Sequence, residues 1–251
     1  MLSFDRIRFR YEPYPIGLAR PVCDEDRYRA LVQGFPPTDL FRHLPKFGNK
    51  YSLSEKNHPD RYRAYIEATP VYRDLHRWIK SPDFIGSVDG MLKAHWIDLG
   101  LGEYRRSTEE RWRMLWRETM AGRFPRISPG LRTRFEFSML PADGGAVLPH
   151  TDTPRKMITL IVSIAEEGEW DQAYGGGTDV NRPKNDRHAF NWVNAQVPFE
   201  EVDVLDTFEF QPNQCVVFVK TFNSLHSVRK MAVAGSTAMR RTLTINIETD
   251  E

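Results

Sequence analysis

The sequence predicts a protein of the α+β class that is mainly β: a β-sandwich or barrel backed by helices from the N-terminal half. Residues 1–125 show mostly the 3.6-residue periodicity of helices, whereas from Leu131 onward apolar and polar residues alternate with period two between turn residues. At 251 residues the chain is long enough for one sizeable core. We therefore expect a single domain over 1–251, with helical support in 1–125 and the β core in 130–248.

The helices of the N-terminal part are predicted from apolar spacing and from capping residues. Asp24 precedes a segment with apolar residues at helical spacing, and Gly34 ends it. Ser107 and Glu110 form a capping box that opens a further helix, which Gly122 ends. Two more helices are expected over 71–80 and 82–96. The tryptophans expected in the core are Trp78, Trp96, Trp112 and Trp116.

Seven short segments of the C-terminal part are predicted as strands. Each combines β-branched or aromatic residues with alternation and is bounded by turn residues. They cover residues 131–140, 146–152, 155–165, a piece near 175–180, 202–210, 214–221 and 240–248. Residues 171–200 are rich in Gly, Asn and Asp, which predicts a long excursion from the sheet, and such loops are often functional lids.

Composition excludes several classes of protein. The formal net charge of +1 gives no strong field toward nucleic acid or an anionic membrane. No stretch approaches 18 apolar residues, and the first residues lack the apolar region of a signal peptide. Cys23 and Cys215 lie far apart in sequence, which suggests neither a disulfide framework nor a zinc site. We expect a cytoplasmic protein.

The triplet His150-Thr151-Asp152 follows a strand-like segment and is the first candidate site. In an extended chain residues i and i+2 project to the same face, so the imidazole and the carboxylate can bind one ion while Thr151 points away. An HxD triplet alone is a weak signal, because two unrelated polar residues in a surface loop produce it as well.

His226 is the candidate third ligand, because it follows a strongly apolar predicted strand, where ligands at the rim of a barrel usually lie. Two imidazoles and one carboxylate on one face of an octahedron leave three adjacent positions open, which is the geometry of non-haem iron(II) oxygenases. A structural zinc site would instead use four protein ligands, typically with thiolates.

The segment 240–248 predicts an inward-facing arginine. Its alternation places Arg240 on a polar face with Thr242, Thr244 and Asn246, opposite an aliphatic face that we expect to pack on the helices. A guanidinium inside a barrel requires a carboxylate, and its two-pronged donor geometry suits one end of a dicarboxylic acid. The alternative is an ion pair with a neighbouring Asp or Glu.

Two other predicted strands face the same interior. In 155–165, Thr159 and Ser163 could donate hydroxyls to the same ligand, or they could mark a solvated face. In 131–140, Arg134 and Glu136 share one face, and Arg155 and Lys156 follow the HTD triplet. Convergent positive charge would favour an anionic substrate, although arginines on strands are also commonly solvated or paired. The candidate substrate residues are Arg134, Glu136 and Arg155.

Taken together, these motifs resemble the 2-oxoglutarate/Fe(II)-dependent oxygenase superfamily, and more closely its prolyl-hydroxylase-like branch. The resemblance covers roughly residues 130–248 and rests on HTD at 150–152, GGGT at 175–178, the run at 210–228 and RRTLTIN at 240–246. It implies a double-stranded β-helix (jelly-roll, cupin-like) as the catalytic core. It also implies that the basic residue after the distal histidine, here Arg240, binds the co-substrate. Many prolyl hydroxylases carry a tyrosine where Ser163 stands, so the hydroxyl partner of Arg240 is left open.

The resemblance implies a dioxygenase that uses Fe(II), 2-oxoglutarate and O2. His150, Asp152 and His226 would hold the iron, 2-oxoglutarate would be decarboxylated to succinate and CO2, and an unactivated C–H bond of a small molecule would be hydroxylated. Related halogenases lack the metal carboxylate, and Asp152 therefore argues against halogenation. Two alternatives are a peptidyl (prolyl-type) hydroxylase and a non-catalytic β-helix binding module with a structural metal.

Overall fold

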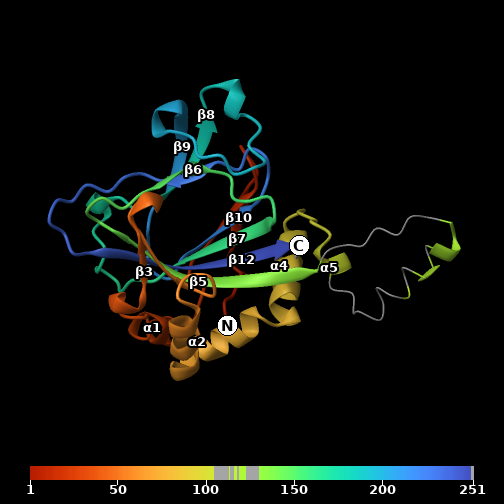
Figure 1. Ribbon diagram of the computed structural model, residues 1–251, viewed down its shortest axis with the longest axis horizontal. Helices are drawn as coiled ribbons and strands as arrows, with labels where there is room; N and C mark the ends of the chain where they lie inside the picture. Colours follow the sequence, from red (N-terminus) through yellow and green to blue (C-terminus); the bar gives the residue numbers. More distant parts are fainter. Residues whose placement is uncertain (105–112, 114–115, 118, 123–129, 250–251) are drawn as a thin grey trace.

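The computed structural model describes residues 1–104, 113, 116–117, 119–122 and 130–249. Within these residues the strands form two antiparallel sheets (Figure 1). The large sheet has the order β1-β2-β10-β7-β12-β5-β4-β3, and the small sheet has the order β6-β11-β8-β9. The strands of the large sheet are β1 (Arg8–Arg10), β2 (Ile16–Ala19), β10 (Cys215–Val219), β7 (Lys156–Ser163), β12 (Met239–Thr249), β5 (Leu131–Pro141), β4 (Lys50–Ser54) and β3 (Arg42–Leu44). Those of the small sheet are β6 (Val147–His150), β11 (His226–Val228), β8 (Thr178–Pro183) and β9 (Val202–Phe208).

All seven predicted strands are confirmed, as β5 to β10 and β12. Four strands of the N-terminal half, β1 to β4, were not predicted, and they extend both ends of the large sheet. β11, which carries His226, was also not predicted. The N-terminal half therefore contributes strands as well as helices to the fold.

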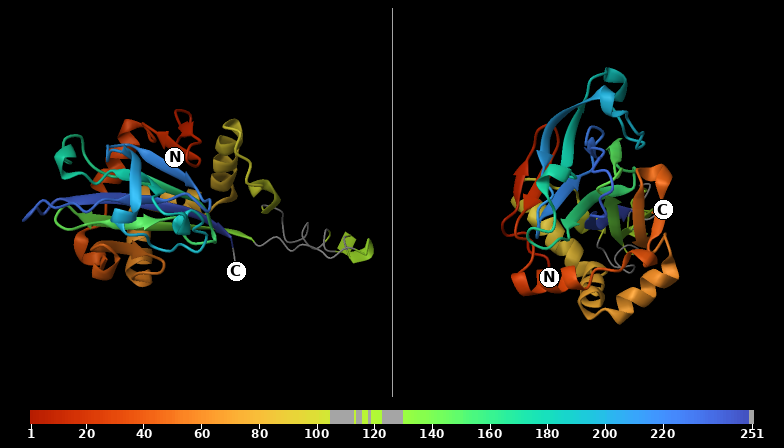
Figure 2. Two further views of the ribbon diagram at one scale, coloured as in Figure 1. Left: turned by 90° about the horizontal axis from the view of Figure 1, so that it is seen from above. Right: turned by 90° about the vertical axis from the view of Figure 1, so that its left-hand side faces the viewer.

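The helices cover one face of the large sheet, and the small sheet lies on the other side (Figures 1 and 2). They are α1 (Glu25–Gln33), α2 (Pro59–Ala68), α3 (Pro70–Ile79), α4 (Pro82–Ala94) and the short α5 (Leu101–Tyr104). α1 begins as predicted, because the Asp24 side chain accepts a hydrogen bond from the Arg27 amide at 2.9 Å. The predicted helices at 71–80 and 82–96 are α3 and α4, and the start of the one opened by Ser107 lies outside the described residues.

Strand alternation separates the two faces of the large sheet as the sequence predicts. Leu243, Ile245 and Ile247 of β12 are fully buried in the main apolar cluster, together with helix residues such as Tyr72 and Leu75. The opposite face of β12 carries polar side chains toward the small sheet. Apolar contacts also join the two sheets, through a cluster that contains Ile16, Val180, Val216 and Phe218.

The prediction of buried tryptophans is wrong for two of the four. Trp78 packs on the main core, but the side chains of Trp96 and Trp116 are 95% and 69% exposed. Trp112 lies outside the described residues. Part of the predicted excursion 171–200 forms β8 and three short 3-10 turns. Within the described residues, no helix combines the length and the apolar character that crossing a bilayer requires.

Candidate metal centre

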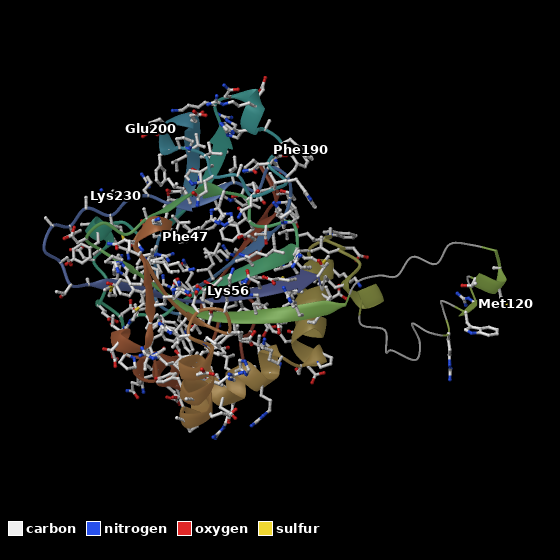
Figure 3. All side chains as sticks on the ribbon, viewed as in Figure 1. Phe47, Lys56, Met120, Phe190, Glu200 and Lys230 are labelled. Atoms are coloured by element: carbon white, nitrogen blue, oxygen red, sulfur yellow. The ribbon has the colours of Figure 1, made fainter. Side chains whose placement is uncertain are left out.

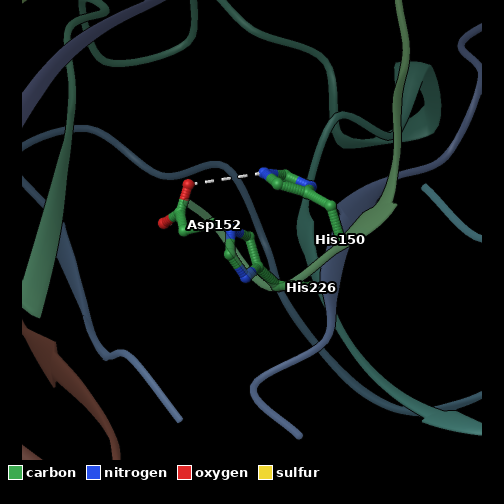
Figure 4. Close-up of side chains that lie close together, drawn as sticks. All are labelled: His150, Asp152 and His226. Carbon is green, nitrogen blue, oxygen red and sulfur yellow. Dashed lines mark ion pairs between the residues drawn. The ribbon is translucent and has the colours of Figure 1, made fainter. Parts of the chain in front are cut away.

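His150 and His226 lie opposite each other on neighbouring antiparallel strands. His150 ends β6, His226 begins β11, and the two residues are register partners with ring centroids 4.4 Å apart. Asp152 follows two residues after His150 and turns its carboxylate toward both rings (Figure 4). One ligand atom from each of the three side chains lies within 4.8 Å of the others. The structure thus brings together the three predicted ligands.

Backbone carbonyls fix the orientation of both imidazoles. Nδ1 of His150 lies 2.9 Å from the Leu148 carbonyl oxygen, and Nδ1 of His226 lies 3.0 Å from that of Ser224. Because a carbonyl only accepts, each Nδ1 carries a proton, and the neutral form of each imidazole then has its lone pair on Nε2. The two Nε2 atoms lie 3.6 and 3.9 Å from the Asp152 carboxylate oxygens. Both Nε2 atoms therefore converge beside the carboxylate, as metal ligation requires.

Asp152 has an unusual backbone conformation, and both of its carboxylate oxygens have contact partners. Its φ of 72° lies in the left-handed region, which Asp tolerates better than most residues. Lys156 Nζ lies 2.6 Å from Oδ1, and the Thr159 hydroxyl donates to Oδ2 at 2.8 Å. Burial alone would raise the pKa of this carboxyl, but Lys156 and the two histidines hold the pKa well below its usual range. The carboxylate is therefore ionised.

His226 is buried and neutral. The Phe218 ring stacks on its imidazole at 4.2 Å between centroids. Burial, reinforced by His150, lowers the pKa of His226 to about 3. Two imidazoles and an ionised carboxylate fit a divalent transition metal of the iron type. In the described part of the chain, no further His, Cys, Asp or Glu joins this group, so it lacks the fourth ligand of a closed zinc site.

Thr159 and Ser163 are both buried on the predicted inner face of β7. The Thr159 hydroxyl lies 2.8 Å from Asp152 Oδ2 and 2.8 Å from Asn246 Oδ1 on β12. It therefore orients the Asp152 carboxylate, a contact that the sequence did not predict. Ser163 pairs with Thr242 of β12, and its backbone carbonyl accepts a hydrogen bond from the Tyr28 hydroxyl at 3.1 Å.

Arg240 points inward and is 5% exposed. Its Nε donates to the Gly176 carbonyl, its Nη2 lies 3.4 Å from the Thr178 hydroxyl, and its guanidinium carbon lies 4.9 Å from the centroid of the Phe210 ring. Burial lowers the pKa of Arg240 to about 10, which still leaves it charged near neutral pH. No carboxylate of the described residues pairs with Arg240. The alternative prediction, an ion pair with a neighbouring Asp or Glu, is therefore not observed among these residues.

The GGGT motif provides the wall beside Arg240. Gly176 has φ of 77°, a conformation that favours glycine, and a Cβ at this position would lie 3.2 Å from Cδ of Arg240. A side chain here would crowd the guanidinium from one side. The sequence singled out this motif but gave it no role.

The candidate substrate residues are engaged in ion pairs. Arg134 Nη1 lies 3.3 Å from Oε1 of Glu248, and Glu136 Oε1 lies 2.7 Å from Lys50 Nζ. Arg155 also has an interaction partner. These contacts match the alternative prediction that the charged residues are paired. These residues therefore provide less free positive charge than a pocket for an anionic substrate requires.

Lys220 is a residue of the site that the sequence did not indicate. Its Nζ lies 2.9 Å from the Thr151 hydroxyl and near the backbone carbonyls of Asn191 and Trp192. Thr151 also donates to the Asn191 carbonyl. Burial lowers the pKa of Lys220 to about 8, and the Asp152 carboxylate partly opposes this effect. Through these contacts the 171–200 segment is attached to the HTD triplet.

A groove of about 890 Å³ lies elsewhere on the molecule, and it is lined by residues 172–177, 204–207, 209 and 229–233. None of the three candidate ligands lines it. It is therefore distinct from the metal centre.

Comparisons with known proteins identify similar structures but no similar sequence. No family model matches the chain, and no curated protein matches it. A prolyl-4-hydroxylase of Pseudomonas putida has a TM-score of 0.46 at 12% identity, and the alignment covers 94% of this chain and 92% of that one. The non-haem α-ketoglutarate-dependent epimerase SnoN of nogalamycin biosynthesis has a TM-score of 0.47 at 13% identity, with coverage of 96% and 78%.

HygX of Streptomyces hygroscopicus, solved with nickel and 2-oxoglutarate bound, has a TM-score of 0.46 at 10% identity, with coverage of 98% and 84%. The chain thus resembles solved structures of 2-oxoglutarate/Fe(II) oxygenases, including a prolyl hydroxylase. Identities of 10–13% with TM-scores of 0.46–0.47 carry no inference about function. Function therefore rests on the geometry of the metal centre.

Proposed function

We propose that this chain is a 2-oxoglutarate- and Fe(II)-dependent dioxygenase of the prolyl-hydroxylase-like branch. It would hydroxylate an unactivated C–H bond of a small molecule and convert 2-oxoglutarate to succinate and CO2. The observation that carries the proposal is the convergence of His150, Asp152 and His226 on one point. The two sheets would then be the halves of a double-stranded β-helix.

The three ligands account for the metal. Fe(II) bound by His150, Asp152 and His226, together with 2-oxoglutarate and O2, would supply the oxidative chemistry. The Leu148 and Ser224 carbonyls orient the two imidazoles so that each Nε2 faces the metal position. The Lys156 and Thr159 side chains orient the Asp152 carboxylate.

Arg240 is the proposed clamp for the distal carboxylate of 2-oxoglutarate. A buried guanidinium that contacts only neutral groups and an aromatic ring in the described residues is costly, and a dicarboxylate would supply its counter-ion. Arg240 also lies on the same face of β12 as Asn246, which contacts Thr159 beside Asp152. The co-substrate would thus extend along β12 from the metal toward Arg240, with Ser163 on the neighbouring strand.

The test is the formation of succinate from 2-oxoglutarate by purified protein with Fe(II) in air, without an added substrate. We expect slow formation by the wild type and none by Asp152→Ala. Asp203→Ala is the matched control, because Asp203 lies on β9 with a side chain that is 47% exposed. Succinate formation equal in Asp152→Ala and wild type, or absent from both, would refute the proposal. Absence together with one tightly bound metal would favour the binding module.

A further inference from the structure

We propose that the substrate is an organic anion whose charged group binds Lys220, beside the metal ligands. This inference rests on the proposed function and extends it to the class of substrate. Lys220 directly follows β10 and lies two residues after Phe218, so both side chains project to the same face of the sheet. The Phe218 ring stacks on His226. The Lys220 side chain therefore lies on the face of the large sheet that carries the metal centre.

Lys220 has no counter-ion among the described residues. Its hydrogen bonds go to the Thr151 hydroxyl at 2.9 Å and to the carbonyls of Trp192 and Asn191 at 3.3 and 3.5 Å. All three partners are neutral. A partly buried ammonium without a carboxylate is costly, and an anion that enters the site would remove this cost.

The charges around the metal centre leave an excess of positive charge. Lys156 pairs with Asp152, which is the one carboxylate among the ligands. The two charges of Fe(II) would cancel those of 2-oxoglutarate. Arg240 would bind the distal carboxylate of 2-oxoglutarate, but in the sum of formal charges over the site its charge and that of Lys220 remain in excess, because Asp152 is matched by Lys156. An anionic substrate is attracted to such a site and a cationic one is repelled.

The nearby acidic residues do not offset this excess. Glu248 is paired with both Arg132 and Arg134, at 3.4 and 3.3 Å. Glu136 is paired with Lys50 and accepts a hydrogen bond from Ser52. Each of these carboxylates therefore already has a cationic partner of its own.

Aromatic side chains stand next to the ammonium and suit the body of an organic anion. Lys220 Nζ lies 5.3 Å from the centroid of the Trp192 ring, and this side chain is 45% exposed. Phe190 and Phe222 stack at 5.2 Å and are 69% and 45% exposed (Figure 3 labels Phe190). Exposed aromatic rings beside a cation provide contact for an apolar moiety next to a charged group.

The experiment is a calorimetric titration of benzoate and of benzamide into protein saturated with Ni(II) and 2-oxoglutarate, which does not turn over. The two probes share a ring and differ in charge. We expect benzoate to bind at least tenfold more tightly than benzamide to the wild type, since a charged hydrogen bond contributes about that factor. Lys220→Met should reduce benzoate binding to the level of benzamide, whereas Lys220→Arg should retain it within a few-fold.

Lys230→Met is the matched control, because it removes the same charge from an exposed lysine. Figure 3 shows Lys230 at the left of the molecule and Phe190 at the upper right. The Lys230→Met variant should bind both probes like the wild type. The inference is overturned if benzamide binds as tightly as benzoate, if Lys220→Met binds benzoate like the wild type, or if neither probe binds. Succinate formation by the same protein loaded with Fe(II) instead of Ni(II) separates the two proposals, because it tests the oxygenase alone.

Discussion

Lys156 Nζ lies 2.6 Å from Oδ1 of Asp152, so a cation of the chain already neutralises the carboxylate that is proposed to bind iron. We expect Lys156→Met to bind Co(II) or Ni(II) about tenfold more tightly at pH 7.5, because an ammonium a few ångströms from a divalent ion opposes its binding. Isothermal titration measures the change. Lys156→Arg should remain close to the wild type. Weaker binding by Lys156→Met would instead mean that Lys156 chiefly positions Asp152.

Thr159→Val should lower metal affinity by roughly 10- to 100-fold, because it removes the hydrogen bond that orients Oδ2 of Asp152. The unfolding free energy should fall by about 1–2 kcal/mol, since the buried Asp152 carboxylate loses a hydrogen-bond donor. Thr242→Val is the matched control on the same interior face, where the hydroxyl lies 3.4 Å from the Ser138 carbonyl. If both variants bind metal equally well, Thr159 does not orient the ligand.

Arg240→Met should raise the KM for 2-oxoglutarate by roughly 100-fold, because it removes the counter-ion of the distal carboxylate. Its unfolding free energy should stay within about 1 kcal/mol of the wild type, since an apolar side chain of similar length replaces a buried charge that no carboxylate pairs with in the described residues. Arg241→Met is the control, because Arg241 faces away and pairs with Glu169. An unchanged KM in Arg240→Met would contradict the clamp.

The metal-free protein should lose stability on acidification because of His226, whose pKa is lowered from 6.5 to about 3, chiefly by burial. Between these values the unfolded chain binds a proton at this histidine and the folded chain does not. The unfolding free energy should therefore fall as the pH decreases below about 6.5, by about 1.4 kcal/mol per pH unit from this group.

Urea denaturation in EDTA at pH 7, 6 and 5 measures this slope. His226→Gln should flatten it relative to the wild type, whereas His43→Gln, at an exposed position, should keep it. Equal slopes in the wild type and His226→Gln would show that the imidazole is not held neutral in the fold.

Alternation along the chain was sufficient to predict the central strands of the large sheet. β5, β7 and β12 each extend over 8 to 11 residues, and one face of each packs on the apolar core, so the period is visible in the sequence. β1, β3 and β11 have three residues each, which is too short to show a period. Their pairing depends on neighbours that are distant in the sequence.

The proximity of the three candidate ligands and the inward direction of Arg240 could be predicted from short motifs and from strand parity. The contacts of Lys156 and Lys220 could not, because a long flexible side chain reaches partners that no spacing indicates. For Trp96 and Trp116 a prediction was made, that of burial, and it was wrong. Large aromatic residues are usually buried, but at these two positions the fold exposes them.

β11 is held on both sides, since His226 is the register partner of His150 on β6 and of Val180 on β8. An ion bound by both histidines would act as a cross-link between β6 and β11, two short strands whose register partners are 76 and 81 residues apart along the chain. Amide protons of these two strands should consequently exchange with deuterium more slowly once metal is added, and those of β9, at the far edge of the small sheet, should be little affected.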